Sequence, residues 1–65
     1  MHIMDERLYV AIGMKEQGGS FVKGLGEALL HADMYNTEKI KKAFLGYWKD
    51  YLKIGIEIES KKPER

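Results

Sequence analysis

The sequence predicts a small, compact all-α domain made of three helices, followed by a polar C-terminal tail. Over most of the chain, apolar residues recur at intervals of three and four, as they do along one face of a helix. Short turns rich in glycine, aspartate and asparagine separate these stretches. With 65 residues the chain has room for one domain, which we assign to residues 1–59. We expect residues 60–65 to be disordered, because this segment is terminal and charged.

A chain this short is expected to need support for its stability. A core of this size supplies about 3–5 kcal/mol, and natural domains this small often add disulfides, a metal ion or a second subunit. The sequence contains no cysteine and two histidines, which excludes disulfides and thiolate zinc sites. We therefore predict no metal and no cofactor. Self-association is the remaining common means of support, so we predict a homo-oligomer, with a dimer favoured.

The first helix is predicted to begin after Asp5, a good N-cap, and to continue to about Gln17. Glycines at positions 18–19 end it. Its helical face comprises Leu8, Ala11, Ile12 and Lys15.

Ser20 is the predicted cap of a second helix. Its amphipathic stripe comprises Phe21, Leu25, Ala28, Leu29 and Ala32. Gly24 and Gly26 lie inside this helix, where each costs about 1 kcal/mol relative to alanine. We interpret them as places where another backbone approaches closely. The small residues spaced four apart form the predicted self-association surface: Gly24, Ala28 and Ala32.

A turn over residues 33–36 is predicted to lead into the third helix, with Asn36 or Thr37 as its cap. This helix is expected to run without interruption to Gly55. Its seam comprises Ile40, Phe44, Tyr47, Tyr51 and Ile54. Residues 56–59 alternate apolar and acidic residues, which fits either a short extended edge or a frayed helical turn. The predicted common core comprises Phe21, Leu25, Leu29, Ile40 and Phe44.

Two groups of residues suggest chemistry, and we assign each a simpler role. Glu27 and His31 lie four apart on one helical face, where they could share a metal or exchange a proton. No third ligand or nucleophile lies nearby in sequence, so we interpret them as an ordinary side-chain pair. The amides of residues 18–20 have the layout of an anion site, but the spacing of a phosphate-binding loop is absent. We therefore predict that the protein is not an enzyme.

The charges are nearly balanced, with 11 basic and 10 acidic residues, which disfavours strongly electrostatic binding of nucleic acid. Lysines nevertheless dominate the predicted third helix, and Lys41 is one of them. An alternative nucleic-acid surface would use Lys39, Lys42, Lys49 and Lys53. A solvated helix face is the simpler interpretation. No apolar run approaches the ~18 residues of a membrane span, and the N-terminus lacks the layout of a signal peptide. We expect a cytoplasmic protein without membrane contact.

Large polar aromatic residues are numerous for so small a core, and Tyr and Trp are favoured at interfaces. The predicted partner-binding residues are Tyr9, Tyr35, Tyr47, Trp48 and Tyr51.

Several segments give the chain a resemblance to short bacteriophage and prophage proteins of unknown function. They span residues 14–23, then Glu27-Ala28, residues 31–33, Ala43-Phe44 and Tyr47-Trp48. Similar proteins often have Pro-Glu where this chain has Leu45-Gly46, which leaves the start of the aromatic helix open to another placement. The resemblance implies a phage origin and a compact helical fold, and it supplies no catalytic residues.

Small phage accessory proteins commonly bind host proteins, including defence nucleases. We accordingly expect a non-enzymatic accessory protein that binds and modulates a host protein, with inhibition of a defence system as one form. The first alternative is a small nucleic-acid-binding regulator that uses the lysines. The second is an oligomeric sponge for a small nucleotide, held by the amides of residues 18–20.

Overall fold

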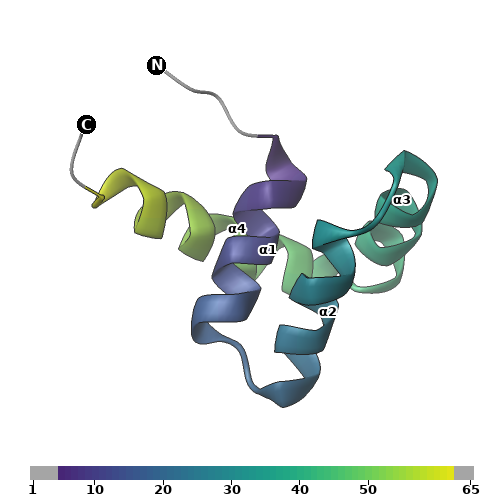
Figure 1. Ribbon diagram of the computed structural model, residues 1–65, viewed down its shortest axis with the longest axis horizontal. Coiled ribbons are helices and arrows are strands. Elements are labelled where there is room, and N and C mark those ends of the chain that lie inside the picture. Colours follow the sequence, from purple (N-terminus) through teal and green to yellow (C-terminus); the bar gives the residue numbers. More distant parts are fainter. Residues whose placement is uncertain (1–4, 63–65) are drawn as a thin grey trace.

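The computed structural model describes residues 5–62, and this part of the chain folds into four α-helices. They are α1 (Glu6–Gln17), α2 (Ser20–Leu30), α3 (Met34–Ala43) and α4 (Leu45–Ser60). In Figure 1, α1 and α2 form a hairpin, α4 crosses behind α1, and α3 lies to one side. The most extensive packing joins α1 to α4 and α1 to α2, so α1 is the central helix. The all-α prediction is confirmed, while the predicted number of helices is wrong.

Helix α1 begins and ends as the sequence predicts. The side chain of Asp5 accepts a hydrogen bond of 3.1 Å from the amide of Leu8, which satisfies one free amide of the first turn. At the other end, the amide of Gly18 donates to the carbonyl of Met14 at 2.9 Å. Gly18 and Gly19 then form the short connection to α2.

The predicted caps of the next two helices are wrong. Gly19 is the N-cap of α2, and Ser20 is already the first helical residue, so its hydroxyl caps nothing. Asp33 caps α3 by accepting a hydrogen bond of 2.8 Å from the amide of Asn36. Asn36 and Thr37 therefore lie inside α3, because an acidic cap three residues earlier starts the helix sooner.

The long third helix that the sequence predicts is divided in two at Phe44. The backbone of Phe44 has φ −127° and ψ 48°, which is outside the helical region and ends α3. Its carbonyl then accepts a hydrogen bond of 2.8 Å from the amide of Trp48, which starts α4 at once in a new direction. Helix α4 continues past Gly55 to Ser60, so residues 56–59 are helical. Of the predicted tail, Ser60 is helical and residues 61–62 form a turn and a bend, so the predicted disorder is wrong for these three residues. Residues 63–65 lie outside the described residues, as do residues 1–4.

The core lies where α1, α2 and the start of α4 meet. Its buried residues are Val10, Ala11, Met14, Val22, Leu29 and Trp48. Leu29 confirms the prediction, and Leu25 and Ile40 are partly buried against this core. Phe21 does not belong to it, because 59% of Phe21 is exposed, and Phe44 is half-buried outside the core.

Glycines allow the helices to approach closely at two crossings. A Cβ atom at Gly13 would lie 3.0 Å from the amide nitrogen of Gly55, and a Cβ atom at Gly55 would collide with the carbonyl of Tyr9. A Cβ atom at Gly26 would lie 2.9 Å from Cβ of Met14. The predicted close approach is therefore confirmed at Gly26, where the neighbour is α1, whereas a Cβ atom at Gly24 would meet nothing within 4 Å.

Candidate interaction surface

Four aromatic rings form a continuous cluster that joins α2 to α4. We call Phe21, Phe44, Tyr47 and Tyr51 the aromatic cluster. The ring centroids of Phe21 and Phe44 are 5.9 Å apart in an edge-to-face arrangement, and those of Phe44 and Tyr47 are 6.2 Å apart and stacked. Tyr47 continues the series to Tyr51 at 6.3 Å. Such ring pairs stabilise each other beyond the area that they bury, so the cluster holds its shape at the surface.

Much of this cluster faces solvent. Phe21 is 59% exposed, Tyr47 is 41% exposed, and Leu45 beside them is 45% exposed. Phe44 and Tyr51 are half-buried beneath. A contiguous apolar patch on a small soluble domain commonly marks an interaction site, whereas isolated exposed apolar residues need no explanation.

A hollow of about 370 Å³ adjoins the cluster at the junction of α3 and α4. The break at Phe44 creates it, because α4 starts in a new direction immediately after α3 ends. Its lining comprises Ala43, Phe44, Leu45, Gly46, Tyr47 and Asp50. Gly46 contributes no side chain, and a Cβ atom there would meet nothing within 4 Å. The hollow is thus a shallow, open apolar depression with one carboxylate, that of Asp50, which makes no ion pair with any described residue.

The structure separates the five predicted partner-binding residues. Tyr47 and Tyr51 belong to the aromatic cluster. Trp48 is 3% exposed, so its ring belongs to the core and is closed to a partner in this structure. Tyr35 is 68% exposed on α3, where the ammonium of Lys39 lies 4.7 Å from its ring centroid. Tyr9 is half-buried at the crossing of α1 and α4.

Two residues of the surface, Phe21 and Phe44, were assigned to the core by the sequence. Phe21 directly precedes Val22, and adjacent helical residues point about 100° apart. Val22 is buried and Phe21 is on the edge of the buried face. For Phe44, the sequence signal is the Leu45-Gly46 pair that follows it. At this pair the resemblance leaves open where the aromatic helix starts, and a helix start there places Phe44 outside the helix.

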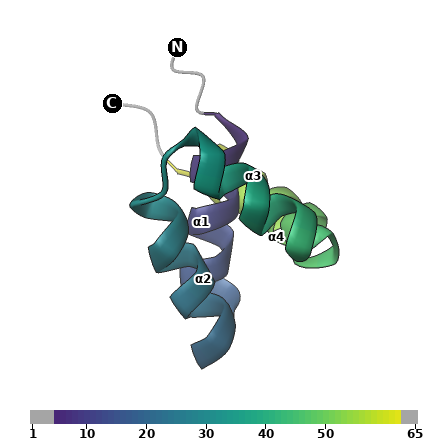
Figure 2. The same ribbon diagram turned by 90° about the vertical axis from the view of Figure 1, so that its right-hand side faces the viewer.

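Two of the three predicted self-association residues lie on a side of α2 that no other described helix covers. Gly24 and Ala28 are exposed, and Ala32 is half-buried in the connection to α3. In Figure 2, α2 stands in front of α1, with α3 and α4 to one side.

The lysines of the alternative nucleic-acid surface are distributed over two helices. Lys39 and Lys42 are on α3, and Lys49 and Lys53 are on α4; all four are exposed. None of them makes an ion pair with a described residue. Lys41 is engaged differently, because its ammonium lies 3.3 Å from Oε1 of Glu6 and 5.4 Å from the centroid of the Trp48 ring.

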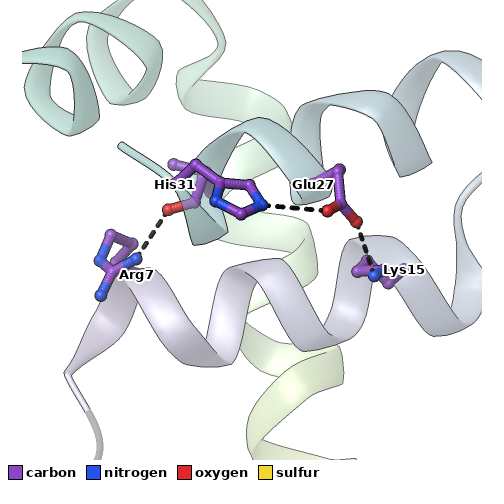
Figure 3. A network of polar contacts seen from close by, with 5 residues as sticks. Arg7, Lys15, Glu27 and His31 are labelled. Atoms are coloured by element: carbon purple, nitrogen blue, oxygen red, sulfur yellow. Dashed lines mark hydrogen bonds and ion pairs between the residues drawn. The ribbon is translucent and has the colours of Figure 1, made fainter. Parts of the chain in front are cut away.

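A network of polar contacts ties α2 to α1 (Figure 3). The carboxylate of Glu27 accepts a hydrogen bond of 2.7 Å from Lys15, and its other oxygen lies 3.2 Å from Nε2 of His31. The hydrogen bond from Lys15, followed by that with His31, lowers the pKa of Glu27 below its ordinary value. The guanidinium of Arg7 donates a hydrogen bond of 2.7 Å to the carbonyl of Leu29, one of the last carbonyls of α2. These contacts hold the hairpin and are accounted for without a ligand.

A second hollow, of about 410 Å³, lies between the start of α1 and α3 and is lined by carboxylates. Asp5 and Asp33 in its lining serve as helix caps, and Glu6 accepts hydrogen bonds from Trp48 and Lys41. Residues 5–62 contain no group of three His, Asp or Glu side chains arranged to hold a metal ion. Three of the acidic side chains that line this hollow, those of Asp5, Glu6 and Asp33, therefore already make hydrogen bonds within the fold.

The nucleotide alternative uses the amides of residues 18–20, which lie between the end of α1 and the start of α2. The amide of Gly18 already donates to the carbonyl of Met14. The carbonyl of Gly19 accepts a hydrogen bond of 2.8 Å from the amide of Lys23, and no side chain caps this end.

Among the described helices, none is long and apolar enough to cross a membrane.

Comparison with known proteins adds no assignment to this geometry. No protein-family description, no curated protein and no solved structure matches the chain. The aromatic cluster and the adjoining hollow are therefore the features that bear on function.

Proposed function

We propose that this protein is a non-enzymatic binding module that docks a partner protein on the aromatic cluster and the adjoining hollow. The observation that carries the proposal is the exposure of Phe21 and Tyr47 around the apolar hollow. Binding energy at protein interfaces concentrates in large rings and in pockets that receive an anchor residue. Here the rings and the hollow adjoin, because the half-buried Phe44 contacts the rings of Phe21 and Tyr47 and also lines the hollow.

The lining of the hollow specifies the chemistry of the partner. An apolar side chain fits between Phe44, Leu45 and Tyr47, and the open backbone at Gly46 lets it approach closely. Asp50 favours a lysine or arginine next to that anchor, because opposite charges at the rim of an interface steer association. The partner segment that we propose is an apolar residue flanked by a basic one.

The resemblance to short bacteriophage proteins supports a host protein as the partner. In this proposal the protein modulates its target by occupying a surface, and inhibition of a host defence system is one form of that activity. Fold alone does not determine function, so the test must recover the partner itself.

Affinity capture from the host, followed by mass spectrometry, tests the proposal with two tyrosine variants. Tyr47→Ala should lose the partner or weaken its binding at least tenfold, since it removes a ring of the cluster. Tyr35→Ala is the matched control, because Tyr35 is also exposed but lies outside the cluster, on α3. Equal recovery with both variants would overturn the proposal, and so would loss with Tyr35→Ala alone.

A nucleic-acid regulator is the second candidate, favoured by Lys42, Lys49 and Lys53, which are exposed and make no ion pair within residues 5–62. Lysines that neutralise phosphates release counterions, so affinity for duplex DNA would fall with salt at a slope of about −0.9 per contact. Lys42→Glu and Lys49→Glu would each weaken such binding. Salt-insensitive binding, or binding that survives both changes, excludes this function. The buried Trp48 offers no stacking surface for bases.

A further inference from the structure

Among the described residues, Gly24 makes no close packing contact with another helix. Of the glycines inside helices, Gly13, Gly26 and Gly55 each lie against an atom of a neighbouring helix that a Cβ atom would crowd. Gly24 lies in the middle of α2 and faces open space. A glycine in a helix interior lowers helix stability relative to alanine, and the packing of this chain offers no compensation at this position.

The exposed side of α2 around Gly24 carries small residues. Ser20 and Ala28 lie one turn before and one turn after it, and all three are exposed. The exposed ring of Phe21 borders this strip on the side of α4. The strip is therefore a shallow surface on which another helix can lie close to the backbone of α2.

The charges beside the strip are self-complementary. Lys23 and Glu27 lie four residues apart along one side of α2, and both are exposed. Lys23 makes no ion pair with a described residue. Each oxygen of Glu27 already has one partner, Lys15 or His31, but a carboxylate oxygen can accept a second hydrogen bond.

We propose that a second copy of this chain packs on this strip, with the two α2 helices antiparallel about a two-fold axis near Gly24. In that arrangement the side of α2 that carries Lys23 and Glu27 faces the same side of the other copy, and the two helices run in opposite directions. Lys23 of each copy therefore lies opposite Glu27 of the other. The same register sets Phe21 of each copy against Ala28 of the other. A parallel two-fold arrangement would instead set the edge with Lys23 and Glu27 against the edge with Phe21 of the other copy, which leaves these charges without partners across the contact.

The size of the contact sets the concentration at which the dimer forms. A standard interface buries about 800 Å² on each partner, which exceeds one face of an 11-residue helix. We therefore expect a reversible dimer with a dissociation constant in the micromolar range. The dimer contact shares Phe21 with the aromatic cluster, but its test needs no partner protein, since the purified chain alone should dimerise.

Analytical ultracentrifugation of the purified chain over micromolar to millimolar concentration tests the dimer. The parent protein should pass from monomer to dimer, and Gly24→Leu should remain monomeric, because its side chain separates the helices. Gly46→Leu is the matched control, since Gly46 also faces open space but lies on α4, and it should dimerise as the parent does. A parent that stays monomeric throughout overturns the proposal, as does a Gly24→Leu variant that dimerises normally.

Two charge reversals test the antiparallel register. Lys23→Glu and Glu27→Lys should each weaken dimerisation roughly tenfold, because the two-fold axis repeats every like-charge contact. An equimolar mixture of the two variants should form heterodimers with an affinity near that of the parent, since every contact then pairs opposite charges. This rescue separates pairing from any loss of the Lys15 contact in Glu27→Lys, while circular dichroism reports folding. A mixture no tighter than its components overturns the register.

Discussion

The indole N–H of Trp48 donates a hydrogen bond of 3.1 Å to Oε1 of Glu6, across 42 positions of the sequence. The same oxygen accepts a hydrogen bond of 3.3 Å from Lys41. One carboxylate thus joins the starts of α1 and α4 to the last turn of α3. Because Trp48 is buried, this bond satisfies the polar atom of the largest side chain in the core.

Removal of the Glu6 carboxylate should destabilise the protein by leaving a buried donor without its partner. We expect Glu6→Ala to lower the free energy of unfolding by roughly 1–3 kcal/mol. Glu6→Gln keeps an acceptor for the indole and should cost less. Urea unfolding monitored by the fluorescence of Trp48, the single tryptophan, measures both. Equal losses for the two variants would show that the hydrogen bond contributes nothing.

Acid should weaken the fold through two carboxyls. Hydrogen bonds from Trp48 and then Lys41 lower the pKa of Glu6, and Lys15 and then His31 lower that of Glu27, from the ordinary value of 4.5. Groups with lowered pKa values in the folded state stabilise it fully above pH 4.5. That contribution disappears as the pH falls through the folded pKa values.

Urea midpoints measured from pH 7 down to pH 3 check this dependence. The midpoint should fall in the acid range, and Glu6→Gln should make the decline shallower. Salt should reduce the contribution of Glu27 more, because its partners Lys15 and His31 are more exposed than the partners of Glu6. If the urea midpoint of Glu6→Gln falls as steeply with acid as that of the parent, Glu6 does not contribute to the pH dependence.

The crossing of α1 and α4 should not tolerate a methyl group at Gly55. Gly55→Ala would drive its Cβ atom into the backbone carbonyl of Tyr9, which cannot yield as a flexible side chain can. We expect a loss of about 1–3 kcal/mol or more, a large share of the stability of so small a domain. Gly46→Ala, at a position in open space, should leave the melting temperature unchanged or slightly raised. Similar melting temperatures for the two variants would contradict the close crossing.

Core and surface apolar residues should separate stability from binding. Met14 is fully buried, so Met14→Ala should cost about 2–5 kcal/mol. Phe21→Ala should cost much less, because most of its ring is already in water, yet it should weaken the proposed partner binding. Phe44→Ala should fall between them in stability, since Phe44 is half-buried. Thermal unfolding and partner capture with the same three variants give both readouts. Phe21→Ala as unstable as Met14→Ala would return Phe21 to the core.

Features that depend on a few neighbouring residues, such as the start of the first helix and the turn after it, could be predicted from the sequence. The all-α class follows from apolar periodicity, the start of α1 from Asp5, and the hairpin turn from Gly18 and Gly19. The close approach at Gly26 also follows from sequence, because a glycine inside a helix is costly unless packing compensates for it. Each of these depends on a few neighbouring residues.

By itself, then, the sequence determined a helical domain, its first two helices and a set of residues too apolar to be left unpacked. Only the tertiary structure decided which of them are buried. Val22 and Phe21 are adjacent and differ by about 100° around α2, so the position of α1 and α4 selects Val22 for the core and leaves Phe21 outside. The break at Phe44 likewise turns Trp48 inward to Glu6 and leaves Tyr47 partly in solvent. Helical periodicity marks an apolar face, but the rotation of that face is set by the helices that pack against it.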